Sequence, residues 1–293
     1  MTEPTFPQRV AVIGGGRMGA GIAQVFATLG STVVIAEASD RAAALDRVAN
    51  GLRRAAERGA LDGRDPADVL ATVSTVAGPA DLPADADLVL EAVPEDPALK
   101  AEVLSAADKI VGPGAVIASN TSSLSITELG AALDNPQRFL GMHFFNPVPA
   151  SVLVEIVRAP STEPAVVERV RGWVAALGKA EVLVNDSPGF ATSRLGVCLG
   201  LEAIRMVEEG VADPASIDRA MELGYRHPMG PLRSTDLVGL DVRLAIAEHL
   251  AATLGPRFAP PLLLREKVSR GELGRKTGQG FFTWDTTSIG GRA

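Results

Sequence analysis

Short, continuous runs of apolar and β-branched residues alternate with longer amphipathic stretches over residues 1–186. Such runs are typical of strands buried on both faces, and the helical stretches between them predict a parallel sheet with helices on both sides. The runs on either side of residue 150 have no long helical stretch between them, so we expect an antiparallel addition there. The expected strands are Val10–Ile13, Thr32–Ala36, Val73–Val76, Leu88–Ala92, Ala115–Ala118, Leu140–Phe144, Leu153–Val157 and Glu181–Val184.

The pattern changes at Ser187-Pro188-Gly189, a helix-start or turn signal, after which apolar residues recur at helical spacing to about Val211. Asp213-Pro214 predicts another helix, because aspartate is favoured at the cap and proline in the first turn. Further helical segments are expected near 237–254 and 261–270, before a glycine-rich tail over 271–282. We therefore predict a doubly wound α/β domain over residues 1–186 and a smaller all-helical domain over residues 187–293.

The composition excludes several classes of protein. The chain is 46% hydrophobic and 22% charged, and its net charge of −7 argues against a nucleic-acid partner. No apolar run is long enough to cross a membrane, and Met1–Arg9 lacks the pattern of a signal peptide. The single cysteine, Cys198, cannot form an internal disulfide, which fits a cytoplasmic protein, and its apolar neighbours place it in the core.

A glycine fingerprint follows the first strand directly. Gly14 permits a tight turn, Gly16 lets a pyrophosphate approach the backbone, and Gly19 lets helix and strand pack closely. The next strand ends at Glu37, where a carboxylate binds the ribose hydroxyls of NAD and repels the 2′-phosphate of NADP. The fingerprint alone leaves FAD open, and Arg41 lies near enough to soften the preference for NAD. The expected cofactor loop of this Rossmann-type domain is Gly14-Gly15-Gly16-Arg17-Met18-Gly19.

His143 ends an apolar strand, and the carboxyl ends of strands are where open α/β sheets bind their ligands. It is therefore a candidate catalytic base, with a hydrogen-bonded core histidine as the alternative. Glu155 stands in the apolar run Val152–Val157, where a carboxylate is costly to bury unless it is paired. If the chain bends back between them, Glu155 can orient the imidazole and stabilise its protonated form, as removal of a hydroxyl proton requires.

Polar residues also end an earlier apolar strand, at Ser119–Ser123. They are either a solvated loop with a helix cap, or hydroxyls and an amide gathered beside a nicotinamide and a substrate oxygen. We expect no metal site.

Together these motifs resemble the 3-hydroxyacyl-CoA dehydrogenase family, particularly its bacterial 3-hydroxybutyryl-CoA members, over nearly the whole chain. The motifs that carry the resemblance are Val12–Ala27, Glu91-Ala-Val-Pro-Glu-Asp, Ser119-Asn-Thr-Ser-Ser, His143-Phe-Phe-Asn-Pro-Val-Pro, Pro188-Gly-Phe, Pro228-Met-Gly-Pro, Asp236-Leu-Val-Gly-Leu-Asp and Gly274-Arg-Lys-Thr-Gly-Gln-Gly-Phe.

The resemblance implies an NAD-binding domain, a helical domain that forms a homodimer, and catalysis by the His143–Glu155 pair. It places Ser122 between the cofactor and the substrate hydroxyl, and Asn146 beside the thioester and the cofactor. It also places Glu95, Lys100 and Lys276 near NAD. Without the resemblance, these last three residues would be interpreted as loop charges.

An acyl-CoA substrate carries phosphates, which an acidic chain must meet locally. Arg47, Arg54 and Arg58 share one face of an expected helix, and the family has a basic residue near position 58. Arg54 and Arg58 are therefore candidates for binding CoA phosphates, and an ordinary solvated helix face is the alternative.

The chain departs from the family pattern near the expected substrate. Ser193 stands where the family has an asparagine that faces the substrate, and serine lacks its reach and amide donor. Ser151-Val152 replaces the usual Met-Lys, and Gly51 replaces a serine. We expect an NAD-dependent dehydrogenase of short-chain (S)-3-hydroxyacyl-CoA. A relative that acts on a carrier-protein thioester or a free hydroxy acid, and a catalytically weak NAD-binding structural protein, are the alternatives.

Overall fold

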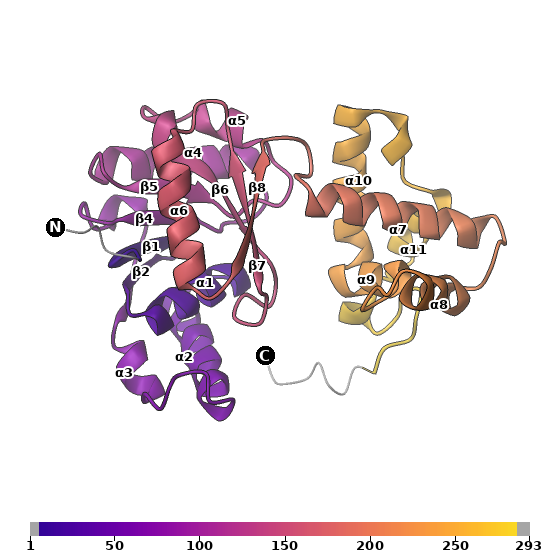
Figure 1. The fold of residues 1–293 in the computed structure, drawn as a ribbon, viewed down its shortest axis with the longest axis horizontal. Coiled ribbons are helices and arrows are strands. Elements are labelled where there is room, and N and C mark those ends of the chain that lie inside the picture. The colour runs from indigo at the N-terminus through magenta and orange to yellow at the C-terminus, as the bar shows by residue number, and fades with distance from the viewer. Residues whose placement is uncertain (1–5, 286–293) are drawn as a thin grey trace. The chain divides into compact units, whose positions relative to one another are not determined.

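The computed structural model describes residues 6–285 and divides into two compact units, one ending at Ser187 and one beginning at Pro188. Figure 1 shows the fold of both units. The expectation about a signal peptide falls partly on residues 1–5, outside the described residues. No helix within residues 6–285 has both the length and the apolar character needed to span a bilayer.

The first unit contains an eight-stranded sheet in the order β3-β2-β1-β4-β5-β6-β7-β8. Every neighbouring pair is parallel except β6 and β7, which are antiparallel. All eight predicted strands and the antiparallel addition are confirmed. The strands are β1 (Arg9–Ile13), β2 (Thr32–Ala36), β3 (Val73–Val76), β4 (Leu88–Glu91), β5 (Val116–Ser119), β6 (Phe139–Phe144), β7 (Leu153–Arg158) and β8 (Ala180–Asn185).

Helices cover both faces of this sheet because the side chains of buried strands alternate between the two faces. Phe26 of α1 and Trp173 of α6 belong to one core cluster with Val12 and Leu90, and α6 lies in front of the sheet in Figure 1. Asp96 caps α4 through the backbone N–H of Leu99, at 2.9 Å. The helices are α1 (Arg17–Leu29), α2 (Arg41–Glu57), α3 (Pro66–Leu70), α4 (Pro97–Ile110), α5 (Ile126–Gly130) and α6 (Pro164–Ala176), with 3₁₀ turns at Pro79–Asp81 and Pro136–Arg138.

The second unit is helical, as predicted. Asp213 caps α8 by accepting hydrogen bonds from the backbone of Ala215 and Ser216, both at 3.0 Å. One helical segment near 237–254 was expected, but Gly239, at φ +105°, separates two helices there. The helices are α7 (Thr192–Glu208), α8 (Pro214–Gly224), α9 (Pro231–Val238), α10 (Leu240–Leu254) and α11 (Leu262–Ser269), with 3₁₀ turns at Pro256–Phe258 and Arg275–Thr277.

The prediction that Cys198 lies in the core is wrong, because its side chain is exposed. Apolar neighbours in sequence do not share a helix face. Val197, Leu201 and Ile204 form the buried face of α7, and Cys198 lies about 100° away from Val197 around the axis.

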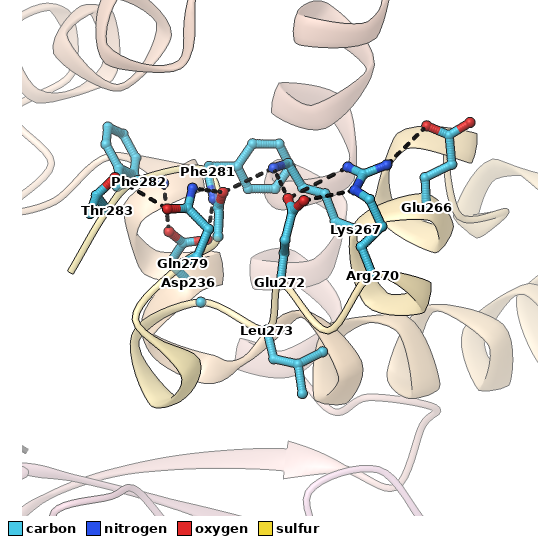
Figure 2. A network of polar contacts seen from close by, with 12 residues as sticks. Asp236, Glu266, Lys267, Arg270, Glu272, Leu273, Gln279, Phe281, Phe282 and Thr283 are labelled. Atoms are coloured by element: carbon cyan, nitrogen blue, oxygen red, sulfur yellow. Dashed lines mark hydrogen bonds and ion pairs between the residues drawn. The ribbon is translucent and has the colours of Figure 1, made fainter. Parts of the chain in front are cut away.

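Asp236 anchors the glycine-rich tail of the second unit (Figure 2). Its carboxylate is fully buried and accepts hydrogen bonds from the backbone of Phe281 and Phe282, both at 2.9 Å, and from Nε1 of Trp284 at 2.8 Å. A Cβ at Gly280 would lie 2.2 Å from Oδ1 of Asp236, so the tail passes where only glycine fits. This contact explains structurally why the Asp236 and Gly274–Phe281 motifs occur together.

Candidate active site

A cleft of about 530 Å³ opens beside the glycine loop, at the carboxyl ends of the first strands. The loop forms as its glycines require. Gly14 has φ +99°, and a Cβ at Gly19 would lie 1.8 Å from the carbonyl oxygen of Gly14. A Cβ at Gly16 would meet no atom within 4 Å, so this glycine leaves room on the cleft side. The lining residues are Ile13, Gly14, Gly16, Arg17, Met18, Ala36–Ser39, Ala77–Pro79, Ala92–Pro94, Leu99 and Val103.

Glu37 stands at the rim of this cleft as a fixed negative charge. Its Oε2 accepts from the backbone N–H of Gly15 at 2.8 Å, and its Oε1 accepts from the backbone N–H of Ser39 at 2.8 Å. The hydrogen bond from the Ser39 hydroxyl is the main cause that lowers the pKa of Glu37 to about 2. The cleft, the open space at Gly16 and the ionised Glu37 fit a dinucleotide with an unphosphorylated adenosine ribose.

His143 and Glu155 face each other across the antiparallel pair β6–β7. Nδ1 of His143 lies 2.9 Å from Oε2 of Glu155, the imidazole is 7% exposed, and the carboxylate is fully buried. The Phe145 ring packs against the imidazole, with ring centroids 4.4 Å apart. The chain does bend back between the two residues, and the hairpin brings the predicted base to its predicted orienting group.

A buried ionic network lies on the neighbouring strand ends. Lys100 of α4 donates to Oε1 of Glu91 at 2.6 Å and to the carbonyl of Val93 at 3.1 Å, and its Nζ lies 3.3 Å from Oε2 of Glu95. Burial raises the pKa of Glu91 against the opposing effect of Lys100. Burial also acts to raise the pKa of Glu95, but Lys100 and the hydrogen bonds from Thr121 and Ser122 outweigh it, and the net change is downward. Val93 lines the cleft, so the network supports its wall.

Glu95 fixes the polar loop that follows β5. Its Oε1 accepts from the Thr121 hydroxyl at 2.6 Å and from the backbone N–H of Ser122 at 3.0 Å. Oδ1 of Asn120 accepts from the backbone N–H of Phe144 at 2.8 Å, which ties the loop to the strand that carries His143. The structure thus brings Glu95, Lys100 and Ser122 together, while Asn146 is exposed just beyond β6.

The other predicted residues lie on other elements of the two units. Arg54 and Arg58 are exposed near the end of α2, while Nη1 of Arg47 donates to the carbonyl of Gly15 at 3.1 Å. In the second unit, Ser193 is half-buried in the first turn of α7. Lys276 forms an ion pair with Asp241, with Nζ 2.6 Å from Oδ1.

Two protein-family models match the chain. One describes the NAD-binding domain of 3-hydroxyacyl-CoA dehydrogenase and matches residues 9–187. The other describes the C-terminal domain of the same family and matches residues 189–284. The chain belongs to the 3-hydroxyacyl-CoA dehydrogenase family. The predictions of the family, of the fold and of an NAD-dependent oxidoreductase are thereby confirmed.

Individual relatives agree over nearly full length. The 3-hydroxybutyryl-CoA dehydrogenase of Mycobacterium tuberculosis is 43% identical over 282 residues, covering 94% of this chain and 98% of the relative. The structure of (S)-3-hydroxybutyryl-CoA dehydrogenase from Ralstonia eutropha has a TM-score of 0.89 at 41% identity, covering 95% of this chain and 99% of that one. A third structure is that of 5-formyl-3-hydroxy-2-methylpyridine 4-carboxylic acid 5-dehydrogenase, an NAD⁺-dependent dismutase. It has a TM-score of 0.75 at 32% identity, covering 96% of this chain and 93% of that one.

Glu91 is a site residue for which the sequence alone indicated no role. It appeared only as the first letter of a motif, although it ends an apolar strand just as His143 does. An acid at the carboxyl end of a buried strand requires a buried partner, and Lys100, in the first turn of α4, provides one. Glu91 therefore explains why Lys100 lies where it does.

Proposed function

We propose that this chain interconverts short-chain (S)-3-hydroxyacyl-CoA and 3-oxoacyl-CoA with NAD as the cofactor. The observation that carries the proposal is the buried His143–Glu155 pair, 2.9 Å apart at the carboxyl end of the sheet, in a chain whose relatives are named 3-hydroxybutyryl-CoA dehydrogenases.

The pair suits proton transfer from an alcohol. An ionised Glu155 can only accept a hydrogen bond, so Nδ1 of His143 carries the proton and Nε2 carries the lone pair. Nε2 then takes the proton of the 3-hydroxyl, and Glu155 stabilises the imidazolium that results. NAD, when bound, would supply the acceptor for the hydride that leaves C3. In the reverse direction His143 returns the proton to the oxygen.

The remaining site residues have positioning roles in this proposal. Ser122, held by Glu95, lies between the cofactor and the substrate hydroxyl, and Asn146 lies beside the thioester. Ser193 faces the acyl group from the first turn of α7. Arg54 and Arg58, exposed on α2, bind CoA phosphates, and Lys276 lies near the cofactor.

A second candidate function is oxidation of a free hydroxy acid. It is favoured by the shorter side chain at Ser193 and by the relative named for a pyridine carboxylic acid, which is 32% identical over 96% of this chain. Steady-state reduction of acetoacetyl-CoA and of acetoacetate, each with NADH, separates the two. We expect a much higher kcat/KM for the thioester, and a higher value for acetoacetate would favour the second candidate.

We also propose that the protein is a homodimer that associates through its helical unit, and that it is cytoplasmic. The apolar residues exposed on α7 support the first proposal, and a single cysteine that lies on the surface supports the second.

A further inference from the structure

Lys179 is a half-buried cation of the first unit that binds two backbone carbonyls instead of an acid. It follows α6 and precedes β8, and its Nζ donates to the carbonyl of Val148 at 2.8 Å and to the carbonyl of Ser151. It forms no ion pair with any residue from 6 to 285. Burial lowers the pKa of its ammonium, because removing a charge from water is costly. The two carbonyls compensate part of this cost.

Both carbonyls belong to the segment that joins β6 to β7, residues 145–152, which we call the hairpin loop. The backbone N–H groups of Ala150 and Ser151 both donate to the carbonyl of Pro147, at 3.0 and 2.9 Å, so the middle of the loop is one tight turn. The carbonyls at the end of such a turn need donors from elsewhere, like those in the last turn of a helix. Lys179 supplies them as a basic side chain does at a helix C-terminus.

Two further contacts fix the hairpin loop. The backbone N–H of Ala180 donates to the carbonyl of Val152 at 2.7 Å. Val148 is 2% exposed and packs in the core with residues of α1, where a Cβ at Gly21 would lie 3.0 Å from the Cβ of Val148. The loop therefore contacts both the start of β8 and the helix that follows the glycine fingerprint.

The hairpin loop begins with two residues of the candidate active site. The Phe145 ring packs against the His143 imidazole. Asn146 directly precedes Pro147, whose carbonyl closes the turn. His143 itself is held opposite Glu155 by the pairing of β6 with β7. A shift of the loop would therefore move Asn146 relative to a base that stays in place.

We propose that Lys179 is a positioning residue that fixes the hairpin loop, and through it Asn146, so that the thioester of the substrate is held against the base. This inference rests on the proposed function and adds a residue that determines how tightly the substrate binds. The hydrogen bonds of Lys179 go to the loop backbone, so it acts on the substrate only through the loop. Its loss should weaken substrate binding and leave proton transfer intact.

Steady-state reduction of acetoacetyl-CoA by NADH tests the proposal. Lys179→Met removes the ammonium, and KM for acetoacetyl-CoA should rise roughly tenfold or more, the effect of losing a hydrogen bond from a charged group. The values of kcat and of KM for NADH should stay close to wild type, as expected when only binding is lost. Lys179→Arg, which can also donate to two carbonyls, should keep KM near the wild-type value. The control is Arg64→Met, because Arg64 likewise donates to two carbonyls, those of Leu61 and Thr28, and its loss should leave KM unchanged.

Hydrogen exchange followed by mass spectrometry tests the loop without any substrate. The amides of Ala150 and Ser151, which close the turn, should exchange at least roughly tenfold faster in Lys179→Met than in wild type, because local opening becomes easier. The amides of β6 should exchange at the wild-type rate. If Lys179→Met does not fold, Lys179→Gln, which keeps a neutral donor, replaces it in both measurements.

The outcomes separate this inference from the proposed function. If wild type does not reduce acetoacetyl-CoA, the proposed function fails and the exchange rates decide the inference. If wild type reduces it but Lys179→Met has an unchanged KM, or Lys179→Arg is as impaired as Lys179→Met, the inference is overturned and the proposed function stands. A fall in kcat at unchanged KM would overturn it as well, because Lys179 would then act on the base.

Discussion

Lys100 and Glu91 form an ion pair that water scarcely reaches, with Nζ 2.6 Å from Oε1 and side-chain exposures of 2% and 0%. The Ser119 hydroxyl donates to the other carboxylate oxygen at 2.6 Å, and the backbone N–H of Val93 donates to Oε1 at 2.7 Å. The pair joins the start of α4 to the ends of β4 and β5. It thereby supports both the cleft wall at Val93 and, through Glu95, the loop that carries Ser122.

Removing one partner of this pair should destabilise the protein more than removing both. Lys100→Met leaves Glu91 uncompensated and should lower the free energy of unfolding by about 3–5 kcal/mol, whereas the double variant with Glu91→Gln should lose less. Lys109→Met, at an exposed lysine of the same helix, is the control and should change little. Urea titration measures all of these, and a Lys100→Met protein as stable as wild type would contradict the prediction.

The sheet was predictable because most of its strands are apolar, β-branched runs, which need no knowledge of tertiary contacts. His143 and Glu155 were predictable as a pair for a related reason, since a carboxylate inside an apolar run has to have a partner. Glu91 was missed, although it stands at the end of an apolar strand. Its pairing with Lys100 depends on how α4 packs against β4, which periodicity does not specify.

Replacement of His143 should act on catalysis and leave the cofactor in place. His143→Gln keeps a polar side chain but removes the base, and turnover should fall by roughly 10²–10⁴-fold, the usual contribution of general acid–base catalysis. NADH binding, followed by fluorescence, should persist. His249→Gln, in α10, is the matched control. A folded His143→Gln enzyme with near wild-type turnover would refute the assignment.

Replacing two glycines of the cofactor loop with alanine should affect two different properties, cofactor binding in one case and stability in the other. Gly16 has φ −65° and nothing within 4 Å of an added Cβ, so Gly16→Ala should fold normally but weaken NADH binding, because the methyl group enters the cleft. Gly19→Ala would place its Cβ 1.8 Å from the carbonyl oxygen of Gly14. This overpacking should lower the free energy of unfolding by at least about 1–3 kcal/mol. Thermal melts and NADH titrations separate the two effects, and equal behaviour of the variants would contradict this interpretation of the loop.

Glu37 should make the enzyme prefer NAD over NADP by roughly 10-fold or more, equivalent to about 1.4 kcal/mol of repulsion. Its pKa of about 2 keeps the carboxylate charged, so the preference should be constant between pH 7 and 9. Because this pKa is depressed, the stabilisation from its hydrogen bonds is complete above the unfolded value of about 4.3 and is lost as the pH falls toward 2. Glu37→Ser should shift the ratio of kcat/KM values toward NADP, and an unchanged ratio would show that Glu37 does not face the ribose.

The exposed face of α7 should hold two copies of the chain together. Leu195 and Leu199 are 63% and 45% exposed, and Cys198 lies between them on the same face. Apolar residues at this spacing form a stripe that is unfavourable in water and typical of an interface. Light scattering at micromolar concentration should therefore give the mass of a dimer.

Leu199→Glu should give monomers, because it would bury two unpaired charges in a symmetric contact. Leu223→Glu, at a 67% exposed leucine of α8, is the control and should remain dimeric. A monomeric wild type would refute the dimer, and a dimeric Leu199→Glu would place the contact on another surface.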